Sequence, residues 1–232
     1  MKLIADIWGS SLGKKYIMAI SGAVLFLFVV GHLVGNLQIF LGRDAINRYG
    51  YFLQNLPELL WPARVGLLTM VGLHITSSIA LALQNRAARP VRYETYQPVG
   101  STYAARTMLV SGIIVAVFII YHVLHFTAQT PGVNLTGQDF HQFPLDHGRA
   151  DIYRMMVTGF QQPIVSAFYV LGVGLLCAHI SHGVSSLFQS LGLNNPVYMR
   201  VFDTLGAAVG VLLFVGYSSI PVAVLAGFLK QP

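Results

Sequence analysis

The stretch LGVGLLCAHISHGVSS, residues 171–186, places two histidines, His179 and His182, inside an apolar run. It belongs to a longer apolar block, 162–187, which as a helix is long enough to cross the roughly 30 Å hydrocarbon core of a bilayer. Imidazole in such a segment is costly unless something binds it. We therefore expect this stretch to combine a membrane-spanning helix with a functional site.

The composition of the whole chain agrees with a membrane protein. Only 9% of the 232 residues are charged and 55% are hydrophobic, which is typical of chains that span a bilayer. Apolar blocks of membrane length occupy residues 17–40, 63–84, 106–128, 162–187 and 202–228, with a long polar loop at 129–161. We predict an all-α membrane protein, a single domain over 1–232 with five transmembrane helices.

The flanks of the first block set the expected orientation. Lys14 and Lys15 precede it, and no small-residue cleavage site follows, so we expect no signal peptide and a cytoplasmic N-terminus. With that orientation, eight Lys and Arg residues lie on the inner side and six on the outer side. We attribute the net charge of +6 to basic flanks beside anionic lipid rather than to nucleic-acid binding.

Cysteine usage and missing motifs exclude several functions. Cys177 is the single cysteine and lies in an apolar block, so neither a disulfide framework nor a covalent CxxCH haem attachment is possible. The chain has no Gly-rich nucleotide loop and no iron–sulfur cysteine pattern. Any haem must be held by its axial ligands and by packing.

Depth in the membrane sorts four histidines into two pairs. With each helix centred and rising about 1.5 Å per residue, His32 and His122 lie roughly 5 and 7 Å toward the outside. His74 lies near the midplane, and His179 about 7 Å toward the inside. Two histidines at matched depth on different helices suit a bis-imidazole haem. One such histidine is as readily a packing residue or part of a proton path, so a haem-free transporter stays open.

Four motifs carry a resemblance to a known family: GHLVGN at 31–36, LHITSSIALA at 73–82, YHVLHF at 121–126 and HISHGVSS at 179–186. In this order they resemble the five-helix, di-haem cytochrome b membrane anchor of succinate:quinone oxidoreductases and quinol:fumarate reductases. The resemblance implies a bundle in which four of the five helices hold two b haems. It assigns His74 and His179 as axial iron ligands of the inner haem, and His32 and His122 as those of the outer haem.

The resemblance also implies a function. It implies the cytochrome b subunit of succinate dehydrogenase, respiratory complex II, in a bacterial cytoplasmic membrane. The partners would be membrane lipid, a flavoprotein subunit that holds the succinate site and an iron–sulfur subunit. Electrons would pass through two haem b to a quinone, which in five-helix members is usually menaquinone. The alternatives are a quinol-linked di-haem cytochrome of the nitrate reductase type and a ferric reductase of the b561 type.

Two residues bear on proton movement under this resemblance. Glu58, in the NLPELLW turn before the second block, matches a glutamate of family members with a distal quinol site, and we expect it to donate or accept quinone protons. The alternative is an ordinary surface carboxylate at a helix start. Cys177 stands where some members have a proton-conducting glutamate, which puts that route in doubt here.

The remaining candidates have supporting roles. We expect haem propionates to be met by residues near the block ends: His182, Arg64, Arg106, Ser21 and Ser185. His182 is equally suited to snorkelling toward the interface. His125 is a candidate for a contact behind the iron ligands or for hydrogen bonding to a quinone. We interpret His141 and His147, among aspartates, as part of a polar loop rather than a metal site.

Overall fold

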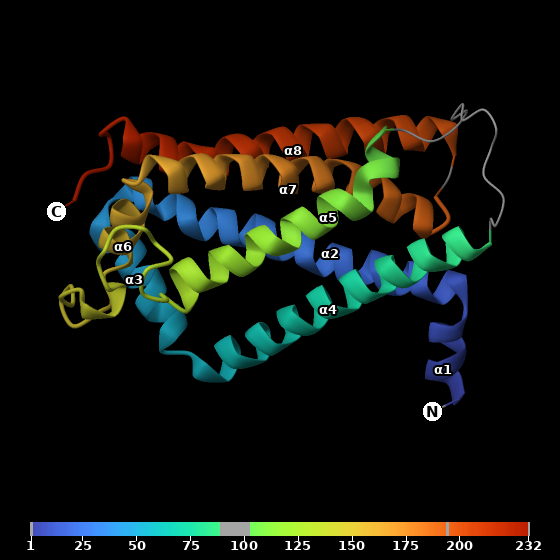
Figure 1. Cartoon of the computed structure of the whole chain (residues 1–232), viewed down its shortest axis with the longest axis horizontal. Helices are drawn as coiled ribbons and strands as arrows, with labels where there is room; N and C mark the ends of the chain where they lie inside the picture. The colour runs from blue at the N-terminus through green and yellow to red at the C-terminus, as the bar shows by residue number, and fades with distance from the viewer. Residues whose placement is uncertain (1, 89–102, 194, 232) are drawn as a thin grey trace. The chain divides into compact units, whose positions relative to one another are not determined.

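The computed structural model describes residues 2–88, 103–193 and 195–231, and its helices follow one another along the chain as Figure 1 shows. The described residues are helical and contain no strand. Five helical segments are long and apolar enough to cross a membrane: Ser11–Leu41, Pro57–Ala87, Arg106–Thr127, Pro163–Ser190 and Val197–Leu225. The predicted all-α class with five spanning helices is therefore confirmed at this level.

The surfaces of these five segments are apolar. Between 11% and 39% of each apolar window is buried inside the protein, so most of each window is at least partly exposed. Large side chains such as Leu27, Leu68 and Leu171 are at least 67% exposed. Leucine in that position is favourable against lipid and unfavourable against water, which supports a multi-pass membrane protein.

The long helices are bounded differently from the apolar blocks. Their bounds are α2 Ser11–Asn36, α4 Pro57–Ala87, α5 Tyr103–His122, α7 Pro163–Ser190 and α8 Pro196–Leu225. A 3-10 turn, η1 Leu37–Leu41, continues α2, and a π-helical turn, η2 Val123–Thr127, continues α5. The apolar blocks mark the lipid-facing part of a helix, whereas the helix itself continues into polar residues beyond it.

Short helices also occur outside the five blocks. They are α1 Lys2–Gly9, α3 Arg43–Gln54, the 3-10 turn η3 Phe140–Gln142 and α6 Ile152–Phe160. The loop predicted at 129–161 therefore contains a helix, α6, whose residues 155–160 are all buried. Asp151 caps α6 by accepting a hydrogen bond from the Arg154 backbone N–H at 3.0 Å. A search for membrane-length runs overlooks a helix this short.

The chain separates into two compact units, each made of parts of several long helices. Unit 1 comprises Met1–Phe28, Arg64–Ile113 and Ala178–Gly210. Unit 2 comprises Val29–Ala63, Ile114–Cys177 and Val211–Pro232. In unit 2, α3 packs against both α6 and η1.

Candidate functional site

Unit 1 brings together the two histidines predicted for the inner haem. His74 of α4 and His179 of α7 face one another with ring centroids 6.3 Å apart and ring planes inclined by 69°. Two imidazole nitrogens on opposite sides of one metal, each about 2 Å from it, place the ring centroids roughly 6 Å apart. The spacing of this pair fits axial ligation of a single iron.

The hydrogen bonds of His74 fix which ring nitrogen is free. Its Nδ1 lies 3.1 Å from the carbonyl oxygen of Met18 and 3.3 Å from Oγ of Ser21. A carbonyl oxygen only accepts hydrogen bonds, so Nδ1 must carry the proton. Nε2 of His74 is then left with an unprotonated lone pair, the form that a metal ligand needs.

The same logic applies to His179. Its Nδ1 lies 3.3 Å from Oγ of Ser111, and that hydroxyl donates its own proton to the carbonyl of Met108 at 3.0 Å. With the serine proton so placed, Ser111 accepts from His179 Nδ1, which again leaves Nε2 as a lone pair. Both paired histidines of unit 1, His74 and His179, are therefore held in the tautomer suited to coordination.

Glycines next to these serines lie against the histidine rings. A Cβ at Gly22 would lie 3.0 Å from Cε1 of His74, and a Cβ at Gly112 would lie 3.4 Å from Cε1 of His179. Ser111 and Gly112 were not among the predicted site residues. A signal for them exists, because a Ser-Gly dipeptide stands eleven residues before a histidine at both Ser21 and Ser111.

Unit 2 brings together the two histidines predicted for the outer haem. The rings of His32 and His122 have centroids 5.7 Å apart and planes inclined by 83°. The amide of Asn36 donates to the backbone carbonyl of His32 at 2.8 Å. This second pair also has a spacing close to that of two axial ligands.

His122 has a different kind of partner from the histidines of unit 1. Its Nδ1 lies 3.4 Å from the hydroxyl of Tyr169, and the same hydroxyl lies 3.0 Å from Nδ1 of His125. His125 is 1% exposed, stacks on Phe126 at 3.9 Å, and has no hydrogen-bond partner for Nε2 among the described residues. Tyr169 was not predicted, since a tyrosine within an apolar block is also an ordinary packing residue.

The remaining predicted site residues lie on α4, α5 and α7. Glu58 is exposed in the first turn of α4, where a carboxylate is favourable at a helix N-terminus. Arg64 and Arg106 are exposed, His182 is half-buried on α7, and Ser185 is buried with its hydroxyl 3.4 Å from the His182 carbonyl. The roles expected for them stay predictions.

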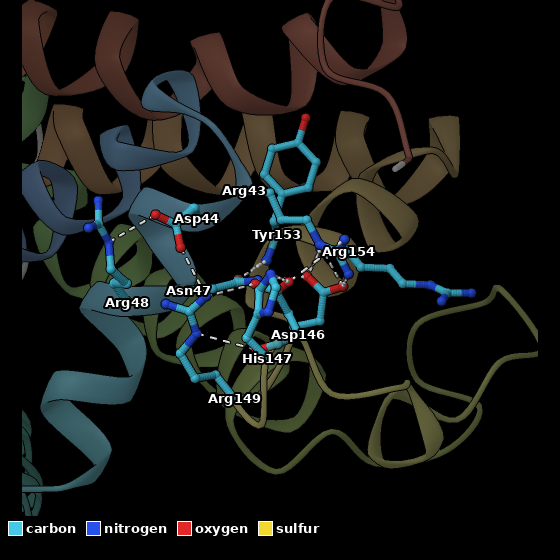
Figure 2. Close-up of polar contacts among 10 residues, drawn as sticks. Arg43, Asp44, Asn47, Arg48, Asp146, His147, Arg149, Tyr153 and Arg154 are labelled. Atoms are coloured by element: carbon cyan, nitrogen blue, oxygen red, sulfur yellow. Dashed lines mark hydrogen bonds and ion pairs between the residues drawn. The ribbon is translucent and has the colours of Figure 1, made fainter.

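A polar network in unit 2 joins α3 to the segment before α6, as Figure 2 shows. Arg43 donates to Asp151 at 2.6 Å, and Asn47 donates to Asp146 at 2.9 Å and to Asp151 at 3.1 Å. Arg149 bridges Asp146 at 3.3 Å and Asp44 at 2.9 Å. We call these six residues, Arg43, Asp44, Asn47, Asp146, Arg149 and Asp151, the polar latch.

Ionisation of the latch follows from its hydrogen bonds. Burial alone would raise the pKa of Asp151, but hydrogen bonds from Arg43, from the Arg154 backbone N–H and from Asn47 outweigh it and hold that pKa below its usual value. The Arg149 guanidinium likewise lowers the pKa of Asp44. Both carboxylates are charged and paired at neutral pH, so the latch is a structural feature rather than an acid or base.

The paired histidines suit haem better than a bare metal ion. No group of three or more His, Cys, Asp or Glu side chains able to hold a metal is present among the described residues. A porphyrin supplies four of the six ligands of its iron, so two imidazoles complete the coordination. A Cβ at Gly31 or Gly72, each close to a paired histidine, would meet no atom within 4 Å.

Comparison with family models, with characterised proteins and with solved structures gives no match to this chain. The function must therefore be argued from the residues themselves.

Proposed function

We propose that this chain is the membrane anchor and cytochrome b subunit of a succinate dehydrogenase of the complex II type. In this role it carries electrons from an iron–sulfur subunit through two b haems to a quinone. The observation that supports it best is the hydrogen bond of His74, whose Nδ1–H donates to the backbone carbonyl of Met18. The free Nε2 belongs to a ring 6.3 Å from that of His179.

The protein's own residues bind and orient the cofactor. His74 and His179 would supply the axial nitrogens of one haem, and His32 and His122 those of the other. The Met18 carbonyl and the Ser21 and Ser111 hydroxyls would fix two of the rings by accepting hydrogen bonds from their Nδ1–H groups. A haem iron bound in this way supplies one-electron transfer. Fixed ring orientation matters, because partners behind a metal ligand set its basicity and hold its geometry.

The wider assembly follows from the resemblance and is part of the same proposal. A flavoprotein subunit would oxidise succinate, and an iron–sulfur subunit would deliver electrons to this chain. The quinone is expected to be menaquinone, the membrane the bacterial cytoplasmic membrane, and the N-terminus cytoplasmic. Glu58, exposed at the start of α4, would exchange protons with the quinone.

A reduced-minus-oxidised spectrum of the purified chain tests the cofactor. We expect a b-type α-band and two haems per chain. His74→Ala and His179→Ala should each remove the same haem, so that the double variant loses no more than either single one. His32→Ala and His122→Ala should remove the other haem. Absence of the α-band from wild type would overturn the proposal.

Succinate-dependent reduction tests the assignment to complex II. Co-purification should yield a flavoprotein and an iron–sulfur subunit, and succinate should then reduce the haems. A haem protein isolated without these partners would favour a nitrate reductase-type or b561-type cytochrome.

Glu58→Gln should slow quinone-linked turnover with haem content intact, whereas the control Asp139→Asn, also in a polar segment, should not.

A further inference from the structure

Tyr169 occupies a buried position between two histidines of unit 2. It lies on α7, is 5% exposed, and its hydroxyl oxygen is 3.4 Å from Nδ1 of His122 and 3.0 Å from Nδ1 of His125. A tyrosine hydroxyl has a single proton to donate and lone pairs to accept with. Because leaving a buried hydroxyl proton without an acceptor is costly, the hydroxyl donates in one of its two contacts and accepts in the other.

Iron ligation through His122 decides between the two directions. If Nε2 of His122 is the ligand, its Nδ1 carries the proton and donates to the Tyr169 oxygen. The Tyr169 hydroxyl must then donate to Nδ1 of His125, which places the His125 proton on Nε2. The three side chains form one directed chain of hydrogen bonds, from His122 to Tyr169 to His125.

Packing fixes the members of this chain in place. The Tyr169 ring lies within 5.4 Å of Phe118 and 5.0 Å of Phe160, measured between centroids. His125 is held against Phe126 and approached closely by α6, where a Cβ at Gly159 would lie 3.0 Å from its Nε2. Neither ring can turn away without displacing neighbours in a closely packed interior.

We infer that Tyr169 is a positioning residue for His122, and that His125 acts through Tyr169 by accepting a hydrogen bond from its hydroxyl. The inference rests on the proposed function, because it concerns how one proposed ligand is held. A hydrogen bond donated by Nδ1 makes an imidazole a more basic ligand and favours the oxidised iron. The bond to Tyr169 therefore lowers the reduction potential of the haem that His122 binds.

Potentiometric titration of the full chain tests the inference with Tyr169→Phe, which removes the hydroxyl and keeps the ring. We expect one of the two midpoint potentials to rise and the other to stay unchanged. Transfer of haem to an excess of a haem-scavenging protein should become about 10-fold faster or more for the same haem. Tyr121→Phe is the matched control, since the Tyr121 hydroxyl donates to the backbone carbonyl of Val133.

A second variant covers the case in which Tyr169→Phe loses the haem. His125→Leu leaves Tyr169 in place and removes the acceptor of its hydroxyl, so it should raise the same midpoint potential by less than Tyr169→Phe does. His125→Gln supplies an amide oxygen as acceptor, so its midpoint potential should lie closer to the wild-type value. If Tyr169→Phe retains both haems and their midpoint potentials are unchanged, the inference is overturned. If Tyr169→Phe loses a haem, unchanged midpoint potentials in His125→Leu overturn it. Wild-type protein without haem would instead overturn the proposed function.

Discussion

The two histidine pairs are held in different ways, although their ring spacings are similar. In unit 1 the ring nitrogens of His74 and His179 contact a backbone carbonyl and serine hydroxyls. These groups belong to the apolar helices α2 and α5. In unit 2 the partner of His122 is a tyrosine shared with a second histidine, packed beneath α6. The first arrangement depends on contacts between spanning helices, whereas in the second the tyrosine and its second histidine also pack against α6, which lies outside the spanning segments.

The largest difference between the units should follow from breaking the polar latch. Asp151→Ala removes the cap of α6 and the carboxylate that accepts hydrogen bonds from both Arg43 and Asn47, which leaves Asp146 as their remaining shared partner. We expect a loss of about 3 kcal/mol of stability. Thermal release of haem from detergent-solubilised protein should show the His32–His122 haem leaving first.

The matched control for this variant is Asp139→Ala. That carboxylate accepts local hydrogen bonds from His141 and Gln142 and joins no distant segment. The control should leave both haems in place. Equal loss of the two haems in Asp151→Ala would show that the latch does not act on unit 2 alone.

Acidification should weaken unit 2 through the same carboxylate. The pKa of folded Asp151 is lowered, so the unfolded chain takes up the proton first as the pH falls. The stabilisation is fully present above the unfolded carboxyl pKa of about 4 and is lost as the pH drops further through the folded value. Melting temperatures at pH 7, 5 and 3.5 should fall at the last step, and by less in Asp151→Asn.

The glycines of unit 1 should respond in opposite directions to alanine. Alanine in a helix interior gains up to about 1 kcal/mol over glycine. At Gly112 the added Cβ would make an ordinary 3.4 Å contact, so Gly112→Ala should be neutral or stabilising. At Gly22 it would lie 3.0 Å from a His74 ring held by Met18, so Gly22→Ala should cost about 1 kcal/mol in haem retention. Similar haem retention in the two variants would contradict the different contacts assigned to Gly22 and Gly112.

The serines should produce the smallest effects, and unequal ones. Ser111→Ala removes the hydroxyl that accepts from His179, with no second acceptor for that nitrogen among the described residues. Ser21→Ala leaves His74 its bond to the Met18 carbonyl. We expect about 1 kcal/mol for Ser111→Ala and less than about 0.5 kcal/mol for Ser21→Ala, measured as haem affinity. A larger effect at Ser21 would mean that the carbonyl does not fix the tautomer.

The pairing of the four histidines is predictable from the sequence, because helix rise and membrane thickness give each histidine an expected depth. Those constraints apply to any apolar helix, and they need no knowledge of its neighbours. The structure brings the rings of each predicted pair within 6.3 Å of one another, and their role as ligands stays a prediction. The helix ends were less predictable, since α2 and α4 continue into polar residues where hydropathy carries no signal. The short helices α3 and α6 were missed because neither is an apolar run of membrane length.

The sequence by itself therefore determined the membrane class and the five spans, and it predicted which histidines lie close to one another. Only the tertiary structure decided which group lies within hydrogen-bond distance of Nδ1 in three of these rings. The group is a carbonyl at His74, a serine hydroxyl at His179 and a tyrosine hydroxyl at His122. The physical reason is that burial depth is a property of one helix, whereas a hydrogen-bond partner depends on the rotation of two. The stretch 171–186 illustrates both, because its position predicted His179 as a ligand but gave no sign of Ser111 behind it.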